Sequence, residues 1–588
     1  MSKRDPNRRT RLASPNLWIP TIVGGTTGLV GFLLGRSFEV PLASDFWKVA
    51  GQPLATAAAG AGAIGAGLLA LHNGSQTREL DREHHQDTMN RDRESNLRDR
   101  YTTAAQQLND DNSAVREAGA YAISALIDDW IGYGKLTEQP SLAHSQAQAC
   151  INQLCSYLRA NRRSVERSEE DSKTTLHGFQ LEEALVRDTI LSVFRENSAR
   201  WLRARREMGS EGISPSTFDL RGARLRGANL GFADLHSANL QGADLQNAEL
   251  SGVKLRSANL RGAILDKADL SGANLTDATL KGAKLTQVKL RGAILVDVDL
   301  AEFDLSGLDL EKANLTGANL IRAKLSAKLS GANLERAELA SANLAEANLT
   351  KAKLAGARLY EAVLAEADLT DAILTDAYLV NATLAHANLV HADLEGADLR
   401  GADLEGADLE GANLGKTNLE RATLSHATFV GANLTDSKMA AAKLIKTTLF
   451  GATLIGADLS GADLSGADLE ESVLTDAVLT NATLIGATLI RANLSDTNLV
   501  EANLSDADLS GANFSDADLS DANLTGANLT RAGLIGATLN RANLTNAELK
   551  GVNFTRVDLT VVDLTNVDLT NVDLIFVDRP GTDIVDTA

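Results

Sequence analysis

The sequence is poor in the residues that build disulfide frameworks, metal sites and nucleic-acid interfaces. Its 588 residues include only two cysteines and nine histidines, and 57 basic residues stand against 77 acidic ones. Cys150 and Cys155 lie about 140° apart around a predicted helix, which suits neither a disulfide nor a metal pair. We therefore expect reduced thiols, as in a cytosolic protein. The net charge of −20 disfavours direct nucleic-acid binding, because an acidic surface repels phosphates.

The sequence also lacks a motif for catalysis or cofactor binding. Its glycines mostly follow the repeat described below, so no glycine-rich phosphate loop is present. His386, His391 and His426 occupy repeat positions that should face solvent, and His84-His85 belongs to a charge-dense run. We therefore predict no catalytic residue, no cofactor-binding residue, no metal site and no enzymatic activity.

A five-residue repeat dominates what is present. Stepping by five from Leu220 to Leu325, and again from Leu329 to Leu574, gives 72 central positions, of which 68 are leucine. The residue two places before the centre is alanine in 56 of these 72 units. The unit is Ala-(Asp/Asn)-Leu-x-x, as in Ala402–Gly406.

A period of five fits neither an α-helix, which needs 3.6, nor a long strand, which needs two. Within one unit, alanine and leucine lie two residues apart, so both can point to one side of a short extended segment. The next two residues suit a turn. Such a unit cannot bury its apolar side alone, so successive turns must stack into a β-solenoid with a Leu/Ala interior and a polar wall.

The stretch 392–404, Ala-Asp-Leu-Glu-Gly-Ala-Asp-Leu-Arg-Gly-Ala-Asp-Leu, resembles the pentapeptide repeat proteins. The resemblance covers roughly residues 218–578. It implies a mainly β fold, a right-handed quadrilateral β-helix with four pentapeptides per coil. The 72 units would then form about 18 coils, roughly 85 Å long at about 4.8 Å per coil.

The repeat is irregular at three places. Ser326-Ala327-Lys328-Leu329 is one residue short, which predicts a bent or tightened corner between Leu325 and Leu329. Phe218, Phe303 and Leu308 replace alanine with bulk and should widen the first coils locally. Near the far end, valine replaces alanine in five successive units, which predicts a thicker terminal coil and a candidate cap. These residues are Val552, Val557, Val562, Val567 and Val572. The pattern stops after Asp578, where Arg579-Pro580-Gly581 should form a terminating turn.

The chain before the repeat differs in character. Residues 17–35 and 49–71 carry no charge, which predicts a transmembrane hairpin, with a cleaved signal peptide as the alternative for the first segment. Basic residues before the first span place both the N-terminus and the solenoid in the cytoplasm. Gly24, Gly28 and the Ala-Gly run 57–62 would allow close helix packing, within the hairpin or between copies.

A charge-dense run and a helical region follow. Residues 100–130 resemble the helical region that often precedes pentapeptide repeats in bacterial membrane proteins, and further helices are predicted near 142–160 and 178–206. This helical region should cover the strand edge of the first coil near Phe218. The expected organisation is a basic cytoplasmic tail (1–15), a transmembrane helix (16–36), a short external loop (37–48), a second transmembrane helix (49–72), a charged helical linker (73–99), an α-helical adaptor domain (100–208), a linker (209–217), the pentapeptide repeat β-helix (218–578) and a C-terminal tail (579–588).

The charge is unevenly distributed along the solenoid. Residues 217–300 hold 9 acidic and 11 basic residues, a net of +2, whereas residues 217–588 together have a net of −20. This acidity can serve solubility and general interaction, or it can imitate DNA, since some pentapeptide repeat proteins resemble duplex DNA and bind DNA gyrase. Acidic runs include Asp393, Asp398, Asp403, Asp408 and Asp458, Asp463, Asp468. On one side, however, Asp398 is followed by Asn418, Lys438, Asp458 and Val478, which interrupts the acidic ladder.

These patterns favour a non-enzymatic, membrane-anchored scaffold that displays an acidic cytoplasmic β-helix to an unknown protein partner. A DNA mimic that binds gyrase or another DNA-binding protein is the first alternative. A self-associating, membrane-organising protein is the second. The expected location is the bacterial inner membrane, as a multi-pass protein with most of the chain in the cytoplasm.

Overall fold

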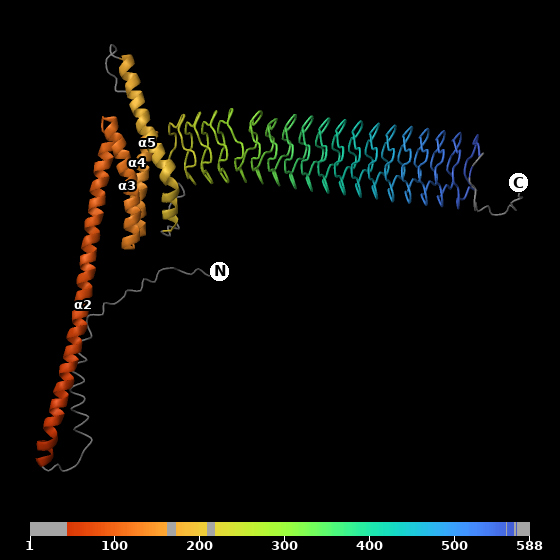
Figure 1. Cartoon of the computed structure of the whole chain (residues 1–588). Coiled ribbons are helices and arrows are strands. Elements are labelled where there is room, and N and C mark those ends of the chain that lie inside the picture. Colours follow the sequence, from red (N-terminus) through yellow and green to blue (C-terminus); the bar gives the residue numbers. More distant parts are fainter. Residues whose placement is uncertain (1–43, 161–171, 208–217, 560, 570–571, 573–588) are drawn as a thin grey trace, which may run out of the picture. The chain divides into compact units, whose positions relative to one another are not determined.

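The computed structural model describes residues 44–160, 172–207, 218–559, 561–569 and 572 (Figure 1). The chain divides into two compact units, residues 1–94 and 95–588, and each is described by itself. The predicted basic tail, the first transmembrane helix (16–36), the linker 209–217 and the C-terminal tail 579–588 lie outside the described residues.

Helix α2 (Ser44–Leu108) is continuous over 65 residues, through both the predicted second transmembrane helix and the predicted charged linker. Its apolar side chains from Ile64 to Leu71 are exposed. Among the described helices, none combines the length and the apolar character that crossing a bilayer requires. The prediction of a multi-pass inner-membrane protein is therefore wrong. The physical reason lies in the run 57–67, where nearly every residue is alanine or glycine and carries little apolar surface.

In the second unit, three helices pack around a shared core: α3 (Ser113–Thr137), α4 (Pro140–Arg159) and α5 (Ser172–Glu207). The end of α2 joins this core through Leu97, Ala104 and Leu108. The Asn112 side chain accepts a hydrogen bond from the Ala114 amide and caps α3. The helices predicted near 142–160 and 178–206 thus correspond to α4 and α5.

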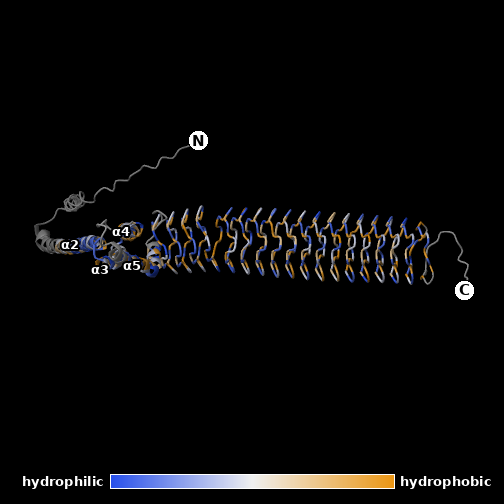
Figure 2. Cartoon of the chain, turned by 90° about the horizontal axis from the view of Figure 1, so that it is seen from above, coloured by the Kyte–Doolittle hydropathy of each residue, from blue (hydrophilic) through white to orange (hydrophobic). Residues whose placement is uncertain are grey.

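The solenoid is built from coils of twenty residues. Each short side pairs in parallel with the side twenty residues later, as Asp219 does with Asn239 and Asp398 with Asn418. Twenty residues hold four pentapeptides, so the four-sided coil expected from the family resemblance is present. Leucine and alanine fill the interior with almost no exposed surface. Hydrophilic and hydrophobic residues alternate along every coil (Figure 2).

Two local hydrogen bonds shape each corner. In a typical unit the Ala223 amide donates to the Leu220 carbonyl, 3.0 Å away, and closes a turn. The residue before alanine has a positive φ, 61° at Gly222, which the third position of a type II turn requires. The Asp or Asn side chain accepts from the amide two residues later, as Asp403 does from Glu405 at 3.1 Å. The Asp and Asn of the repeat are therefore structural as well as polar.

The shortened unit is a tightened corner, as predicted. Between Leu325 and Leu329 the left-handed turn residue is missing, and Ala327 is buried in its place. The pairing offset changes from 20 to 19 residues across this coil, as in Lys324 with Asn343, and returns to 20 at Lys328 with Asn348. The deletion is thus absorbed within one corner, and stacking continues.

Packing loosens toward the far end of the described solenoid. Val552 and Val557 are buried, whereas Val562, Val567 and Val572 are only partly buried. The last pairing joins Asn543 to Asp563. The predicted terminating turn at 579–581 lies outside the described residues.

The helices cover the edge of the first coil on three of its sides. Arg159 donates to the Asp219 carbonyl at 2.6 Å, and Arg187 donates to the Arg224 carbonyl at 3.0 Å. The Asp234 amide donates to Ser198 Oγ at 2.9 Å. Phe194 of α5 packs edge-on against Phe218 with ring centroids 5.3 Å apart. The expected cover of the first strand edge is therefore present, and it supplies polar partners for backbone groups that have no preceding coil.

This cap should weaken in acid. The Arg221 side chain, together with Arg159, lowers the pKa of Asp219 to about 2. An unfolded aspartate has a pKa of about 3.9, so the stabilisation is fully present above about pH 4 and is lost as the pH falls through about 2. Asp219→Asn should lower the unfolding temperature of the capped end at pH 5, and the difference from the native chain should vanish near pH 2. Tryptophan fluorescence reports this transition, since Trp201 packs on Phe194. A difference that persists unchanged at pH 2 would contradict the assignment.

A few hydroxyl residues replace alanine inside the coils. Ser472 donates to the Leu469 carbonyl at 2.7 Å, and Thr497 donates to the Leu494 carbonyl at 2.6 Å. The Ser437 hydroxyl is equally buried but has no hydrogen-bond partner. Inside a stack of leucine and alanine such a group is a net cost.

Ser437→Ala should therefore stabilise the solenoid by about 1–2 kcal/mol, the cost of an unpaired buried polar group. The matched change Ser472→Ala removes a hydrogen-bonded hydroxyl and should be neutral or destabilising. Urea unfolding of both variants, followed by circular dichroism, measures the two shifts. Equal shifts for the two variants would show that the Ser437 hydroxyl does have a partner.

Candidate interaction surface

The solvent-facing wall of the solenoid offers three positions per unit: the Asp/Asn position and the two corner residues. The Asp and Asn side chains are partly held by their hydrogen bond to the corner amide, while most corner side chains are more exposed. Because every coil repeats after about twenty residues, residues about twenty apart form columns along one side.

Charge on this wall differs from one part of the solenoid to another. Residues 393–412, the acidic coil, hold seven acidic residues and one arginine, a net of −6. Residues 458–477 hold six acidic residues and no basic one, again −6, whereas residues 438–457 between these regions hold three lysines and no acid, a net of +3. The wall is therefore banded rather than uniformly acidic.

The columns show the same interruption. Successive parallel pairs join Asp398 to Asn418, Asn418 to Lys438, Lys438 to Asp458 and Asp458 to Val478, in the order predicted. Arg400 donates to Asp398 at 2.6 Å and lowers the pKa of that carboxyl. Both features reduce the continuous negative field that a DNA-like surface would need.

Two tyrosines break the polar wall beside the acidic coil. Tyr360 and Tyr378 stack with ring centroids 5.8 Å apart and an interplanar angle of 25°. They are 38 % and 41 % exposed. We call these two residues the tyrosine patch. Exposed, mutually supported tyrosines are typical of the centres of protein interfaces.

The five-residue pattern alone did not indicate this patch. Tyr360 is a corner residue and Tyr378 occupies an Asp/Asn position, and they are eighteen residues apart in the sequence. With coils of twenty residues, a separation of eighteen brings a corner residue beside the Asp/Asn position of the next coil. The four-pentapeptide coil implied by the resemblance already allowed this contact, which joins a corner to a neighbouring side and does not follow a column of residues twenty apart.

The other residues singled out in the sequence do not form a site. His386 and His391 lie over Gly406 and Gly411 of the next coil, where any added Cβ would meet the imidazole. Cys150 and Cys155 are free and buried, and burial raises the pKa of each thiol to about 12. In the described part of the chain, no three metal-ligating side chains gather.

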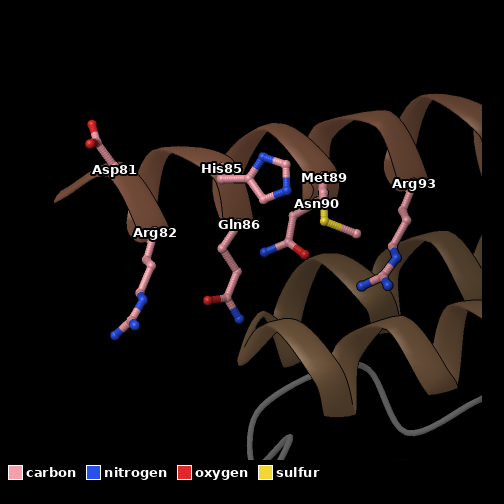
Figure 3. Close-up of a pocket in the computed structure, with 7 residues that line it drawn as sticks. All are labelled: Asp81, Arg82, His85, Gln86, Met89, Asn90 and Arg93. Atoms are coloured by element: carbon pink, nitrogen blue, oxygen red, sulfur yellow. The ribbon is translucent and has the colours of Figure 1, made fainter. Parts of the chain in front are cut away.

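A hollow along α2 also lacks convergent chemistry. The side chains that line it project at intervals from this one helix, so they do not meet at a common point (Figure 3). They are Asp81, Arg82, His85, Gln86, Met89, Asn90 and Arg93. The surface of the solenoid remains the candidate functional site.

Several solved structures are similar to parts of this chain. HetL, a pentapeptide repeat protein involved in heterocyst differentiation regulation in the cyanobacterium Nostoc sp. strain PCC 7120, is 35% identical over 43% of this chain and 90% of its own, with a TM-score of 0.16. QnrB1, a plasmid-mediated fluoroquinolone resistance protein, is 22% identical over 31% of this chain and 91% of its own, with a TM-score of 0.22. A pentapeptide repeat protein of the Arabidopsis thaliana thylakoid lumen is 38% identical over 19% of this chain and 70% of its own, with a TM-score of 0.11. These TM-scores carry no argument about function.

No protein with a curated functional description matches this chain. The family model "Pentapeptide repeats (8 copies)" matches successive segments from residue 219 to residue 578, which is more than half of the chain. Within the described residues, this range coincides with the coils of about twenty residues and their Leu/Ala interior. The chain belongs to the pentapeptide repeat family.

Proposed function

We propose that this protein is a non-enzymatic interaction scaffold, which binds a protein partner through the wall of its solenoid. The tyrosine patch is the observation that carries the proposal. On a largely polar wall, it places two aromatic rings side by side across neighbouring coils. Burying exposed tyrosine surface supplies binding energy that the surrounding polar positions cannot supply.

Charge near the patch favours a partner with basic groups. Glu361 and Asp376 lie within one coil of the tyrosines, and the acidic coil begins at residue 393. The other charged neighbours are paired, Arg358 with Glu338, Arg400 with Asp398 and Glu395 with Lys416. An arginine of a partner could stack on Tyr360 or Tyr378 and reach these carboxylates. The proposed partner is therefore a protein surface with exposed arginine or lysine and some apolar area.

The DNA-mimic alternative has weaker support. The family resemblance suggests it, and the acidic coil is consistent with it. Against it, residues 438–457 carry a net of +3 in the middle of the acidic region. Duplex DNA presents uninterrupted negative charge, one per about 1.7 Å of its axis.

The decisive test is crosslinking and affinity purification with the full chain and a matched pair of variants. Tyr360→Thr/Tyr378→Asn replaces both rings with residues common at these repeat positions. The expected result is loss of the captured partner, with affinity reduced at least about tenfold, since interface tyrosines often contribute about 2 kcal/mol or more. Phe450→Thr is the control, because Phe450 is an equally exposed corner aromatic in another part of the wall.

Other outcomes would decide against this proposal. Capture of gyrase or another DNA-binding protein, released by moderate salt and lost on Asp458→Lys/Asp463→Lys/Asp468→Lys, would support the mimic. Capture of this chain alone would support self-association. Equal capture by the tyrosine variant and the Phe450 control would exclude the tyrosine patch as the binding surface.

A further inference from the structure

One interruption of the backbone ladder stands out within the solenoid. Every central residue from Leu220 to Leu534 donates its amide to the next coil, except Leu280 and Leu285. The parallel pairs of Thr279 with Asp299 and Lys284 with Asp304 are missing as well. We call the gap between residues 278–287 and residues 299–306 the open seam. A wider step between two coils marks its position in both views of the solenoid (Figures 1 and 2).

Interior bulk accounts for the open seam. Val298, Phe303 and Leu308 follow one another at positions where most coils have alanine. Phe303 comes directly over Ala283 of the preceding coil, and these two are the only inward residues between Phe218 and Val557 that are not fully buried. The widening predicted for bulky residues therefore occurs at Phe303. At Phe218 the ladder stays closed, because that ring packs on Phe194 of the helices.

The open seam extends over two adjacent sides of the coil. On the third side the ladder closes in part, through Leu290 to the Asp309 carbonyl at 3.2 Å, without a return bond from the Asp309 amide. On the fourth side it closes fully, through Leu295 to the Asn314 carbonyl at 2.7 Å and the Asn314 amide to the Ala293 carbonyl at 2.8 Å. The intact sides hold the two coils together, so the seam is a persistent feature of the folded chain and does not require unfolding of the solenoid.

The rims of the open seam carry the backbone groups of two strand edges. The lower rim has the amides of Leu280, Gly282, Leu285 and Gln287, whose regular acceptors are out of reach. The upper rim has the amides of Asp299 and Asp304 and the carbonyls of Asp299, Ala301, Asp304 and Ser306. A ligand that satisfies both rims needs alternating donors and acceptors at a rise of about 3.3 Å per residue, which is the spacing of an extended peptide.

Side chains around the open seam add two preferences. Phe303 and Ala283 provide an apolar floor for every second side chain of such a peptide. Outside, Asp304 pairs with Lys324 at 3.5 Å and Glu302 with Arg322 at 3.8 Å, which neutralises two of the upper carboxylates, while Asp299 accepts hydrogen bonds from the Ala301 amide and the Asn319 side chain. Lys281 and Lys284 on the lower rim are exposed, and neither forms an ion pair with a described residue.

We infer that the open seam is a docking site for an extended segment of a partner protein. The segment adds its backbone to both rims, places small apolar side chains toward Phe303 and turns acidic side chains toward Lys281 and Lys284. This mode of binding is strand addition. Between the helical cap and residue 534, only the open seam offers strand edges whose ladder hydrogen bonds are unmade in both directions. This inference goes beyond the proposed function, because it concerns other residues and a partner segment of the opposite charge. Either proposal can fail without the other.

The first measurement is amide hydrogen exchange of the full chain. The amides of Leu280, Gly282, Leu285 and Gln287 should exchange faster than those of Leu290 and Leu295 in the same coil. Phe303→Ala restores the residue usual at this position and should slow them by closing the ladder. Phe429→Leu, which replaces another buried aromatic with the usual residue, is the control and should leave them unchanged. Slow exchange of these four amides in the native chain would overturn the proposal.

The second measurement uses displayed random peptides of about ten residues, the length of two sides of a coil. Peptides selected on the full chain should be acidic, and they should protect the four amides from exchange. They should bind Phe303→Ala and Lys284→Glu at least about tenfold more weakly, or about 1.4 kcal/mol, while binding Phe429→Leu unchanged. N-methylation of alternate peptide amides should abolish binding. If Phe303→Ala fails to fold, Lys284→Glu and the N-methylated peptides still decide. Selected peptides that bind all variants equally, or a selection that yields no protecting peptide, would overturn the proposal.

Discussion

The stacking of one leucine and one small residue inside every side of every coil is the constraint on which the rest of this structure depends. Two inward residues per pentapeptide leave the backbone close enough to the next coil for parallel hydrogen bonds, as between Leu394 and Asn413 at 2.7 Å. The same spacing places a turn after each leucine and an Asp or Asn beside it. Any change in the size of an inward residue therefore acts directly on the ladder.

The exceptions to this rule are where the chain departs from a plain solenoid. Phe218 is accommodated because Phe194 of α5 receives it, and this contact joins the helices to the first coil. Phe303 has no such neighbour, and the ladder is open beside it. The missing turn residue after Leu325 alters one corner only, because the pairing offset returns to twenty residues in the following coil. A bulky inward residue thus leaves the ladder closed at the capped end, where a helix packs on it, and opens the ladder within the stack.

The same constraint separates structural from functional polarity on the wall. Aspartates such as Asp403 hold the turn, so their number alone says little about a partner. The informative positions are those where the wall departs from its own pattern: the stacked Tyr360 and Tyr378, and the basic residues 438–457 between two acidic regions. Both features suit recognition of a protein surface better than imitation of a nucleic acid.

The sequence by itself determined the solenoid, its start near residue 218 and its interior, because a five-residue period leaves each side chain only one environment. It predicted widening at Phe218, Phe303 and Leu308 alike, whereas the ladder is open beside Phe303 and closed beside Phe218. It also located the helices that became α3, α4 and α5. It misjudged residues 49–72, where the absence of charge was taken for membrane affinity although alanine and glycine carry little apolar surface. Only the tertiary structure decided which side chains meet across corners and where the ladder stays open, since these contacts depend on how neighbouring coils and helices pack and not on the period of the repeat. The tyrosine patch, the polar cap on the first coil and the unpaired rims of the open seam all arise from such contacts between coils or between coil and helix.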